Sequence, residues 1–455
     1  MDRPSVVETL DPQLAALFGL RRGETRLGLS STRRLLRLAG DPARGIPVVH
    51  VAGTNGKGST TALAAAMLQA AGLRVGRFTS PHVLRVEERI CVDGLPIAPD
   101  TLRRRIRDLW PLIEPSGASF FEAMTALAAV HFRDEKCDVA VYEVGLGGRL
   151  DSTNVLPASV SILTSVGNDH EAILGRGLQN VCREKLGIAK RGVPFFAALE
   201  RRDLVSLARE SCGRRRAPLT LLPEDCGRVL AMGLESGMQF DLQFPIAARI
   251  TTRLYGAHQV RNTALAAAAV RELWRRGAID RPPDVVRGAA RAFMPGRFQV
   301  LMPYRREPAM VLDVGHNPQA FAATLDVAAQ LLPGIRPRVV LGLLRDKRLG
   351  HTAARLAAFA CDIVLTAPAM DRSWDARAAR REFPTGRQDA KVRVEPRVRD
   401  ALEWALDSAP QGTPVFVLGS HYLLGEAVPL LAARRGVAPD VLLYGTRDEP
   451  LRAAV

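Results

Sequence analysis

Short apolar runs alternate with helical patterns along most of the chain. The first apolar run, at residues 47–52, is followed at residues 57–71 by an alanine-rich segment of helical composition. The alternation continues with strand candidates at residues 74–79, 138–144, 160–166 and 193–199 and helical segments at 120–136 and 178–190. Because strands that are joined by helices form crossover units, this pattern predicts a mainly parallel sheet with helices on both faces.

The alternation is interrupted between about residues 215 and 255, where short runs of alternating polarity predict a small antiparallel sheet. A helical pattern at residues 257–275 follows, and Pro295 and Gly296 then mark a candidate hinge. Beyond it the alternation resumes, with strand candidates at residues 309–314, 338–343, 362–367, 391–395 and 414–418. We therefore predict an α/β protein with a mainly parallel sheet domain over residues 1–296 and a smaller Rossmann-like α/β domain over residues 297–455.

A glycine-rich turn between the first predicted strand and helix, HVAGTNGKGST, has the composition of a phosphate-binding loop. Its glycines let backbone N–H groups approach an anion, and the helix N-terminus adds free donors and a positive dipole end. Lys57 supplies a charge for the β and γ phosphates, and Ser59 or Thr60 offers a hydroxyl to phosphate or Mg²⁺. The loop departs from the general pattern G-x-x-x-x-G-K-[ST], because valine stands at the first glycine position and a further glycine follows the lysine. An ordinary glycine turn before a helix is the alternative.

Three polar residues, Ser80, Glu143 and His170, follow strand candidates of the same predicted sheet. Because the carboxyl ends of parallel strands border one crevice, we expect these side chains to lie near the phosphate loop and to form a metal site. Glu143 could there hold Mg²⁺ directly or through water, whereas a solvated cap is the alternative for a lone strand-end glutamate. Lys185 lies on a predicted helix, and its local pattern alone indicates a surface lysine.

The net charge of +16 is the unusual feature of the composition. Such a charge attracts polyanions, either nucleic acid or a substrate with several carboxylates and phosphates. The basic residues are dispersed, however, aromatic residues make up only 5%, and no nucleic-acid-binding module is recognisable, so we favour compositional drift. No apolar run has the length of a membrane span, the N-terminal residues lack a signal-peptide pattern, and the six cysteines form no C-x-x-C pair. We expect a cytoplasmic protein.

Seven motifs follow one another along the chain: HVAGTNGKGST, TSPHV with EERI downstream, EVGLGGRLDSTN, DH followed by LG, REKLGIAK, MPGRFQV and LDVGHNP. Together they closely resemble the folylpolyglutamate synthase/dihydrofolate synthase family of the Mur ligase superfamily, from about Leu27 to the 340s. The resemblance implies a ligase that uses ATP to add L-glutamate to dihydropteroate, to tetrahydrofolate, or to both. ATP would phosphorylate a carboxylate, and the amine of glutamate would then attack the acyl phosphate, a reaction that depends on positioning and charge neutralisation.

The resemblance also implies roles for individual residues. Lys185 matches a family lysine that becomes carbamylated and then holds a second Mg²⁺, while the first metal would be held by Ser80, Glu143 and His170. His316 matches a position near the active-site face of the second domain, and with Lys57 and Lys185 it completes the implied catalytic set. The implied ATP contacts are Thr54, Asn55, Gly56, Lys57, Gly58, Ser59, Asn262, Arg297 and Asp313.

A pterin-type substrate would by the same resemblance contact Leu27, Gly28, Leu29, Ser30, Phe120, Phe121, Glu122, Leu150, Asp151 and Ser152. Phe121 is suited to stack on a flat heterocycle, with a place in the helix core as the alternative. Because the implied ATP contacts lie on both sides of the candidate hinge, domain closure would complete the site and keep water from the acyl phosphate. The expected partners are thus small molecules, with neither nucleic acid nor membrane, and we expect a monomer.

Two alternatives stay open. A paralogous Mur-type ligase could act on another pterin-like acid, and the stretch at residues 369–385 departs from the family pattern, which leaves amino-acid specificity and polyglutamylation open. Peptidoglycan-precursor ligases fit less well, because only about 46 residues precede the loop where they carry a nucleotide-sugar domain. A P-loop nucleic-acid-binding ATPase would suit the charge of +16, but no arginine finger or nucleic-acid motif is recognisable.

Overall fold

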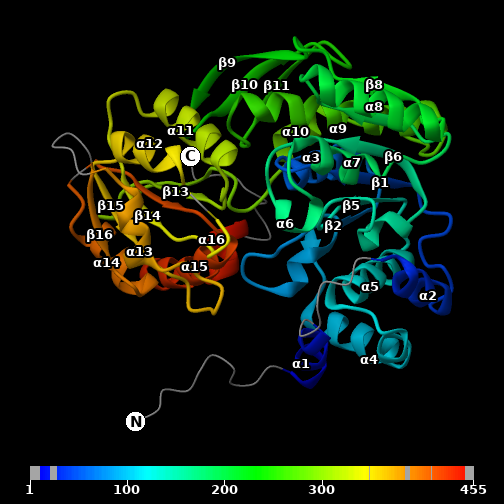
Figure 1. The fold of residues 1–455 in the computed structure, drawn as a ribbon, viewed down its shortest axis with the longest axis horizontal. Coiled ribbons are helices and arrows are strands. Elements are labelled where there is room, and N and C mark those ends of the chain that lie inside the picture. Colours follow the sequence, from blue (N-terminus) through cyan, green and yellow to red (C-terminus); the bar gives the residue numbers. More distant parts are fainter. Residues whose placement is uncertain (1–10, 21–27, 348, 385–389, 411, 446–455) are drawn as a thin grey trace. The chain divides into compact units, whose positions relative to one another are not determined.

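The computed structural model describes residues 11–20, 28–347, 349–384, 390–410 and 412–445. The described residues divide into two compact units, each with its own sheet (Figure 1). The first unit takes the described residues within 11–81, 86–224 and 262–288, and the second takes those within 82–85, 225–261 and 289–445. The predicted domain boundary after residue 296 stays a prediction.

The first unit is built on an eight-stranded sheet with the order β4-β3-β2-β5-β1-β6-β7-β8. Its strands are β1 (Val48–Ala52), β2 (Val75–Phe78), β3 (Ile90–Val92), β4 (Leu95–Pro96), β5 (Val139–Glu143), β6 (Ala158–Leu163), β7 (Phe195–Ala197) and β8 (Leu219–Leu221). The six strands from β2 to β8 in this order pair in parallel, and β3 and β4 are antiparallel. β1 and β5 are buried along their whole length, as expected for apolar strands covered on both faces. The predicted mainly parallel sheet is confirmed.

Some helices of the first unit begin at a side-chain cap or directly after a glycine. Ser119 and Glu122 form a capping box at the start of α5, with each side chain accepting from the other residue's backbone N–H. α3 packs against β1, β2 and β5, and Gly288 lets the chain approach it closely, because a Cβ there would lie 2.3 Å from Met67 Cα. The helical segments are α1 (Pro12–Gly19), α2 (Ser30–Leu38), α3 (Lys57–Ala70), η2 (Val86–Arg89), α4 (Pro99–Ser116), α5 (Phe120–Asp134), η3 (Ser152–Val155), α6 (Glu171–Leu174), α7 (Leu178–Leu186), α8 (Arg202–Arg215), α9 (Ala257–Arg275) and α10 (Val285–Arg291).

A separate three-stranded sheet interrupts the α/β alternation. β9 (Gly227–Gly233), β10 (Gly237–Leu242) and β11 (Ala248–Thr252) are antiparallel with β10 in the centre. The alternating sequence matches the burial of β10, where Met238, Phe240 and Leu242 are buried. This sheet confirms the predicted antiparallel excursion between residues 215 and 255.

The second unit contains a six-stranded sheet with the order β12-β13-β17-β14-β15-β16. Its strands are β12 (Gln299–Leu301), β13 (Met310–Asp313), β14 (Arg338–Leu341), β15 (Asp362–Leu365), β16 (Lys391–Val394) and β17 (Val415–Leu418), and β12 alone pairs antiparallel. Figure 1 shows α11 (Pro318–Leu331) and α12 (His351–Phe359) on one side of this sheet, and α14 (Val398–Asp407) and α15 (His421–Arg435) on the other. The predicted second α/β unit is confirmed, and its remaining helices are α13 (Ala376–Ala379), η4 (Arg380–Glu382) and α16 (Pro439–Tyr444).

The atypical stretch at residues 369–385 has a defined structure up to residue 384, and Thr385 lies outside the described residues. Ser373 forms a β-bridge with Leu344, which follows β14, and the buried Trp374 donates its indole N–H to Thr366 O. α13 and η4 complete the stretch. Among the described helices, none combines the length and apolar character needed to cross a membrane.

Candidate active site

The glycine-rich turn lies between β1 and α3, where the sequence predicts it. Gly56 has φ of +85° at the N-terminus of α3, and a Cβ on it would lie 2.6 Å from Asn262 Oδ1. A Cβ on Gly53 would lie 1.8 Å from Thr164 Oγ1. Glycine at these two positions is therefore required by a left-handed backbone in one case and by close packing in both.

The loop after β6 holds the phosphate loop in place. Thr54 N–H donates to Ser165 O at 2.9 Å, and Asn55 N–H donates to Ser165 Oγ at 3.0 Å. Asn55 O in turn accepts from the hydroxyls of Thr164 and Ser165 at 2.7 and 2.9 Å. Thr164 and Ser165 are thus positioning residues that we did not identify from the sequence, although their place at the end of a strand beside β1 is a usable signal.

Two lysine side chains converge on one carbonyl of the phosphate loop. Lys57 Nζ donates to Gly53 O and Thr54 O at 3.1 Å each, and Lys185 Nζ donates to the same Gly53 O at 2.9 Å. Two ammonium groups that share an acceptor repel each other, so an anion bound between or beside them would be stabilised.

Lys185 is a buried residue with a side chain directed into the site. It lies on α7 with only 4% of its surface exposed, so the surface position that its local pattern indicated is wrong. Burial and, to a smaller extent, the charge of Lys57 lower the pKa of Lys185 to about 7, and Asp169 opposes the shift. At neutral pH much of the Lys185 amine is therefore uncharged, which is the form that reacts as a nucleophile.

Glu143 and Ser80 meet at the carboxyl ends of two adjacent strands. Glu143 is the last residue of β5, is 3% exposed, and accepts a hydrogen bond from Ser80 N–H at 3.1 Å. The sheet order β2-β5-β1-β6 places the residues that follow these four strands along one edge. The topology therefore brings Ser80, Glu143 and the phosphate loop to the same edge of the sheet.

His170 follows β6, at the end of the same edge, in a left-handed conformation with φ of +54°. Its side chain is 41% exposed and its Nε2 lies 3.8 Å from Asp169 Oδ1, while the Asp169 side chain is only 12% exposed. The charge of Asp169 also raises the pKa of Lys185, so Asp169 is a further acid of the site, one that we did not single out from the sequence. Among the described residues, no group of three or more His, Cys, Asp or Glu side chains is arranged to hold a metal ion.

The residues present suit Mg²⁺ through their chemistry. Ser80 and Glu143 supply hydroxyl and carboxylate oxygens, which are the hard donors that Mg²⁺ prefers, and Mg²⁺ usually keeps several waters and phosphate oxygens besides one or two carboxylates. The N-terminus of α3, which begins at Lys57 directly after the glycine-rich turn, offers backbone N–H groups and a positive dipole end to a polyphosphate. The predicted set therefore fits a nucleotide-bound metal better than a site made by protein alone.

Asn262, with Arg297 and Asp313 of the second unit, completes the predicted nucleotide set, and His316 of the second unit belongs to the predicted catalytic set. Asn262 lies on α9 and faces the phosphate loop at Gly56. Asp313, the last residue of β13, accepts from Phe298 N–H and Gly315 N–H at 2.8 and 2.7 Å. Burial raises the pKa of Asp313, and the nearby Arg297 opposes that shift. His316 Nδ1 lies 3.0 Å from Val314 O and so carries the proton that it donates to this carbonyl.

The predicted pterin contacts fall into three segments of the first unit. Leu27 lies outside the described residues, whereas Gly28, Leu29 and Ser30 lead into α2. Glu122 is buried at the start of α5, where it accepts from Ser119 N–H and from Thr32 Oγ1. The remaining members of the set are Phe120, Phe121, Leu150, Asp151 and Ser152.

Phe121 and the segment at Asp151 are held mainly by contacts within the protein. The Phe121 ring packs over Gly145, where a Cβ would lie 2.4 Å from it, and its centroid is 5.7 Å from that of Phe78. Phe121 is only partly buried. Ser152 Oγ lies 2.6 Å from Thr125 Oγ1, and Asp151 accepts hydrogen bonds from its own loop.

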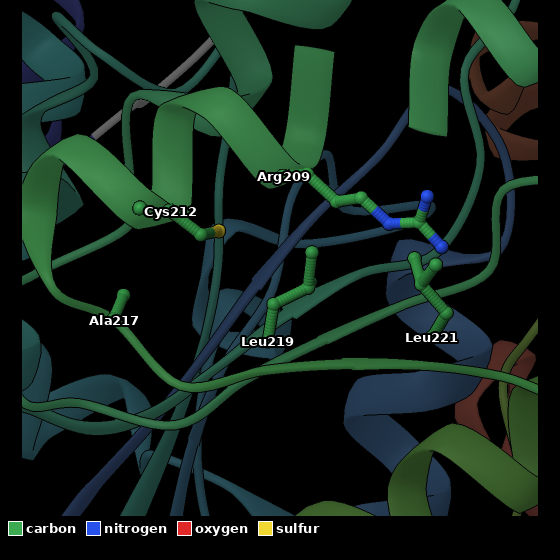
Figure 2. A pocket seen from close by; sticks show the side chains of 6 residues that line it. Arg209, Cys212, Ala217, Leu219 and Leu221 are labelled. Carbon is green, nitrogen blue, oxygen red and sulfur yellow. The ribbon is translucent and has the colours of Figure 1, made fainter. Parts of the chain in front are cut away.

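A cavity of about 350 Å³ lies elsewhere in the first unit, between α8 and the edge strand β8. Figure 2 shows Arg209 and Cys212 of α8 facing Leu219 and Leu221 of β8. β6 and β7 separate β8 from β1 and its phosphate loop. Since one arginine is the only charged residue among its lining residues, this cavity lacks the groups for phosphoryl transfer.

Comparisons with known proteins agree with these motifs. Residues 51–270 match the Mur ligase middle domain, and residues 296–421 match the Mur ligase glutamate ligase domain. The chain is 34% identical to the dihydrofolate synthase/folylpolyglutamate synthase of Bacillus subtilis, over 73% of this chain and 79% of that protein. It is 32% identical to the Mycobacterium tuberculosis protein of the same name, over 86% and 85%.

Two solved structures show the same fold. The Mycobacterium tuberculosis folylpolyglutamate synthase complexed with ADP and AMPPCP superposes with a TM-score of 0.81 at 29% identity, over 94% of this chain and 100% of that chain. Escherichia coli FolC in complex with DHPP and ADP gives a TM-score of 0.81 at 26% identity, over 93% and 99%.

Proposed function

The chain belongs to the dihydrofolate synthase/folylpolyglutamate synthase family of Mur ligases, and we propose that it joins L-glutamate to a folate-type acid at the expense of ATP. The acceptor is dihydropteroate, tetrahydrofolate, or both. The observation that carries the proposal is the convergence of Lys57 and Lys185 on the Gly53 carbonyl, on the sheet edge where Glu143 ends β5.

The reaction has two steps. A carboxylate oxygen of the acceptor attacks the γ-phosphorus of ATP and displaces ADP, which gives an acyl phosphate. The amine of L-glutamate then attacks the acyl carbon, the amide bond forms, and inorganic phosphate leaves with the amine having lost a proton. Lys57 and the N–H groups of the phosphate loop hold the phosphates in line, with contacts proposed for Thr54, Asn55, Gly56, Gly58 and Ser59.

Ser80, Glu143 and His170 are the proposed ligands of one Mg²⁺, which when bound would neutralise charge on the transferred phosphoryl group. We propose that Lys185 becomes carbamylated by addition of its uncharged amine to CO₂ with loss of a proton. The product has an anionic oxygen where the ammonium stood, so it relieves the repulsion from Lys57 and adds an oxygen donor for a second Mg²⁺. The burial of Lys185 beside Lys57 supports this modification.

The remaining members of the predicted sets have supporting roles. Asn262 lies at the phosphate loop and is proposed to contact the nucleotide, as are Arg297 and Asp313 of the second unit. His316 is proposed to act on the glutamate-binding side. The pterin contacts proposed around Phe121 agree with the partial exposure of this residue, because an aromatic ring can stack on a flat heterocycle.

We further propose a monomer that works in the cytoplasm. All six cysteines are free thiols, and five of them are buried, which is typical of proteins in a reducing compartment. Size-exclusion chromatography with light scattering tests the oligomeric state, because a dimer would give about twice the mass of the chain.

A substrate panel tests the function directly. The purified protein is given ATP and Mg²⁺, with dihydropteroate or tetrahydrofolate in separate reactions, each with and without L-glutamate. We expect phosphate release that requires both the pterin acid and glutamate, with the corresponding amide detected by mass spectrometry. If protein that still binds ADP turned over neither dihydropteroate nor tetrahydrofolate, the assignment would be overturned. ATP hydrolysis stimulated by nucleic acid would instead support a P-loop motor.

A further inference from the structure

Three buried polar side chains form a hydrogen-bonded chain between β1, the strand that leads into the phosphate loop, and the segment at η3 that follows β5. His50 lies in the middle of β1, and its Nε2 is 2.8 Å from Thr153 Oγ1. Thr153 Oγ1 lies 2.5 Å from Asp151 Oδ1. His50 and Thr153 are completely buried, and Asp151 is 6% exposed.

The direction of donation along these hydrogen bonds follows from the donors and acceptors that each side chain offers. An ionised carboxylate only accepts, so the single hydroxyl proton of Thr153 is donated to Asp151. The Thr153 oxygen must then accept from His50, and Nε2 of the imidazole carries the proton. Burial lowers the pKa of His50 well below its usual value, which keeps the ring neutral, and its Nδ1 has no hydrogen-bond partner among the described residues.

The Asp151 carboxylate fixes the turn that begins directly after Glu143. Oδ2 accepts from Gly145 N–H at 3.0 Å and from Leu146 N–H at 2.9 Å. Oδ1 accepts from Thr153 N–H at 3.0 Å besides the hydroxyl. These four donors match the four acceptor positions of a carboxylate, so the turn is held from both oxygens.

The same loop is attached to α7 on both sides of Lys185. Arg149 N–H donates to Glu184 O at 2.8 Å, and the side-chain amide of Asn154 donates to Gly187 O at 3.2 Å. The packing is close here, because a Cβ on Gly148 would lie 3.0 Å from Lys185 O. A displacement of the loop would therefore move the backbone at Glu143 and at Lys185 together.

We propose that His50, Thr153 and Asp151 form a positioning chain that fixes Glu143 and Lys185 relative to the phosphate loop. None of the three is proposed to touch the reacting phosphoryl group, and they act through the backbone at residues 145–149. The proposal rests on the proposed function for the identity of the reaction, but the geometry it predicts concerns the metal–nucleotide site alone. Burying such a chain costs desolvation that apolar side chains would avoid, which agrees with a positioning role.

The test uses two replacements of one residue in the full-length protein. Thr153→Val keeps the shape but removes the hydroxyl, and Thr153→Ser keeps the hydroxyl but removes the methyl group. We measure Mn²⁺ binding in the presence of ADP by electron paramagnetic resonance, together with kcat and the KM for ATP. Loss of a residue that orients metal ligands typically weakens metal affinity or activity by about 10–100-fold, so we expect this loss for Thr153→Val and less than about threefold for Thr153→Ser.

Thr366→Val is the matched control, because it removes another completely buried threonine hydroxyl, which donates to Pro396 O in the second unit. We expect Thr366→Val to keep the Mn²⁺ affinity of the wild type. Wild-type Mn²⁺ affinity and kcat in Thr153→Val would overturn the proposal. Equal losses in Thr153→Val and Thr153→Ser would also overturn it, since the methyl packing and not the hydrogen bond would then be the cause.

A second pair of variants probes His50, at the other end of the hydrogen-bonded chain from Asp151, and is used if Thr153→Val does not fold. His50→Leu removes the Nε2–H donor, whereas His50→Gln carries an amide N–H to about the same position. We expect the Mn²⁺ affinity to fall in His50→Leu and to be largely retained in His50→Gln, and equal affinities in both would contradict the proposal. Wild-type protein that binds Mn²⁺ and ADP but turns over no folate substrate would refute the proposed function without affecting this comparison.

Discussion

In each of the two mainly parallel sheets one internal strand ends in a buried acid, and the two acids have different surroundings. Glu143 ends β5 in the first unit and Asp313 ends β13 in the second, with exposures of 3% and 8%. Asp313 accepts from two backbone N–H groups, one on each of its oxygens. Glu143 accepts from Ser80 N–H through Oε2, on a sheet edge that also carries the phosphate loop and its two converging lysines.

The difference teaches that burial at a strand end does not by itself make an acid a ligand. At Asp313 the carboxylate connects the segment at Phe298 with the turn at Gly315, and its removal would leave two backbone donors without an acceptor. Glu143 accepts from Ser80 N–H on the sheet edge that also carries the phosphate loop, so a charged carboxylate there suits metal and phosphate chemistry. We therefore expect changes at Glu143 to affect mainly turnover, and changes at Asp313 to affect both stability and the proposed nucleotide contact.

The largest expected effect concerns Lys185. Lys185→Ala removes the side chain that shares the Gly53 carbonyl with Lys57, and we expect kcat to fall by about 10³-fold, the upper range for loss of one charge-stabilising group. Formate or acetate should restore part of the rate by supplying the oxygen of the proposed carbamate. Lys391→Ala, at an exposed lysine of the second unit, is the control and should turn over like the wild type. Wild-type turnover of Lys185→Ala without added carboxylate would exclude the carbamate.

The next effect separates the two acids directly. Glu143→Gln keeps an acceptor for Ser80 N–H but removes the charge, so we expect kcat to fall by about 10²-fold with little change in the unfolding midpoint. Asp313→Asn replaces one oxygen by an N–H₂ group that faces a backbone donor, so we expect a loss of about 1–3 kcal/mol in the free energy of unfolding. Steady-state kinetics and urea denaturation of both variants decide the matter. A large stability loss in Glu143→Gln would show that the two acids have the same role.

Two glycines with left-handed backbones provide a third and smaller contrast. Gly56 has φ of +85° and faces Asn262, whereas Gly436 has φ of +67° at the end of α15 with open space around it. Alanine should cost about 1 kcal/mol of stability at either position through backbone strain. In Gly56→Ala we also expect the KM for ATP to rise by about 10-fold, because the Cβ would push Asn262 and the loop apart. An unchanged KM in Gly56→Ala would remove Gly56 from the nucleotide site.

The sequence predicted the two sheets well because their strands are continuous apolar runs between helical patterns. The predicted helix at residues 257–275 coincides with α9, and the strand candidates at 309–314 and 414–418 contain β13 and β17. Phosphate-loop chemistry was also accessible, since glycines and a lysine between a strand and a helix have few other uses.

The partners of the site residues were not accessible from the sequence. The local pattern of Lys185 indicated a surface residue, and only the packing of α7 beneath the phosphate loop explains its burial. The chain from His50 to Asp151 joins residues about 100 positions apart through a threonine that no local pattern singles out. Such contacts depend on strand order, and the adjacency of β1 to both β5 and β6 had to come from the structure.

The smallest expected effect concerns Lys190, which supports the loop beside the first edge. Its Nζ donates to Asn154 O and Leu156 O, and burial together with the charge of Arg33 lowers its pKa to about 8.

Between pH 8 and the unfolded pKa of about 10.4 the unfolded chain therefore binds more protons than the folded chain, so the free energy of unfolding increases with rising pH. We expect the difference in unfolding free energy between wild type and Lys190→Met to move in favour of the wild type by about 0.5 kcal/mol per pH unit in this window, below the limit of about 1.4 because the side chain is partly exposed. Below pH 8 the difference should be constant. Urea denaturation at pH 7, 8, 9 and 10 measures this difference, and a constant difference over the whole range would show that folding does not lower the pKa of Lys190.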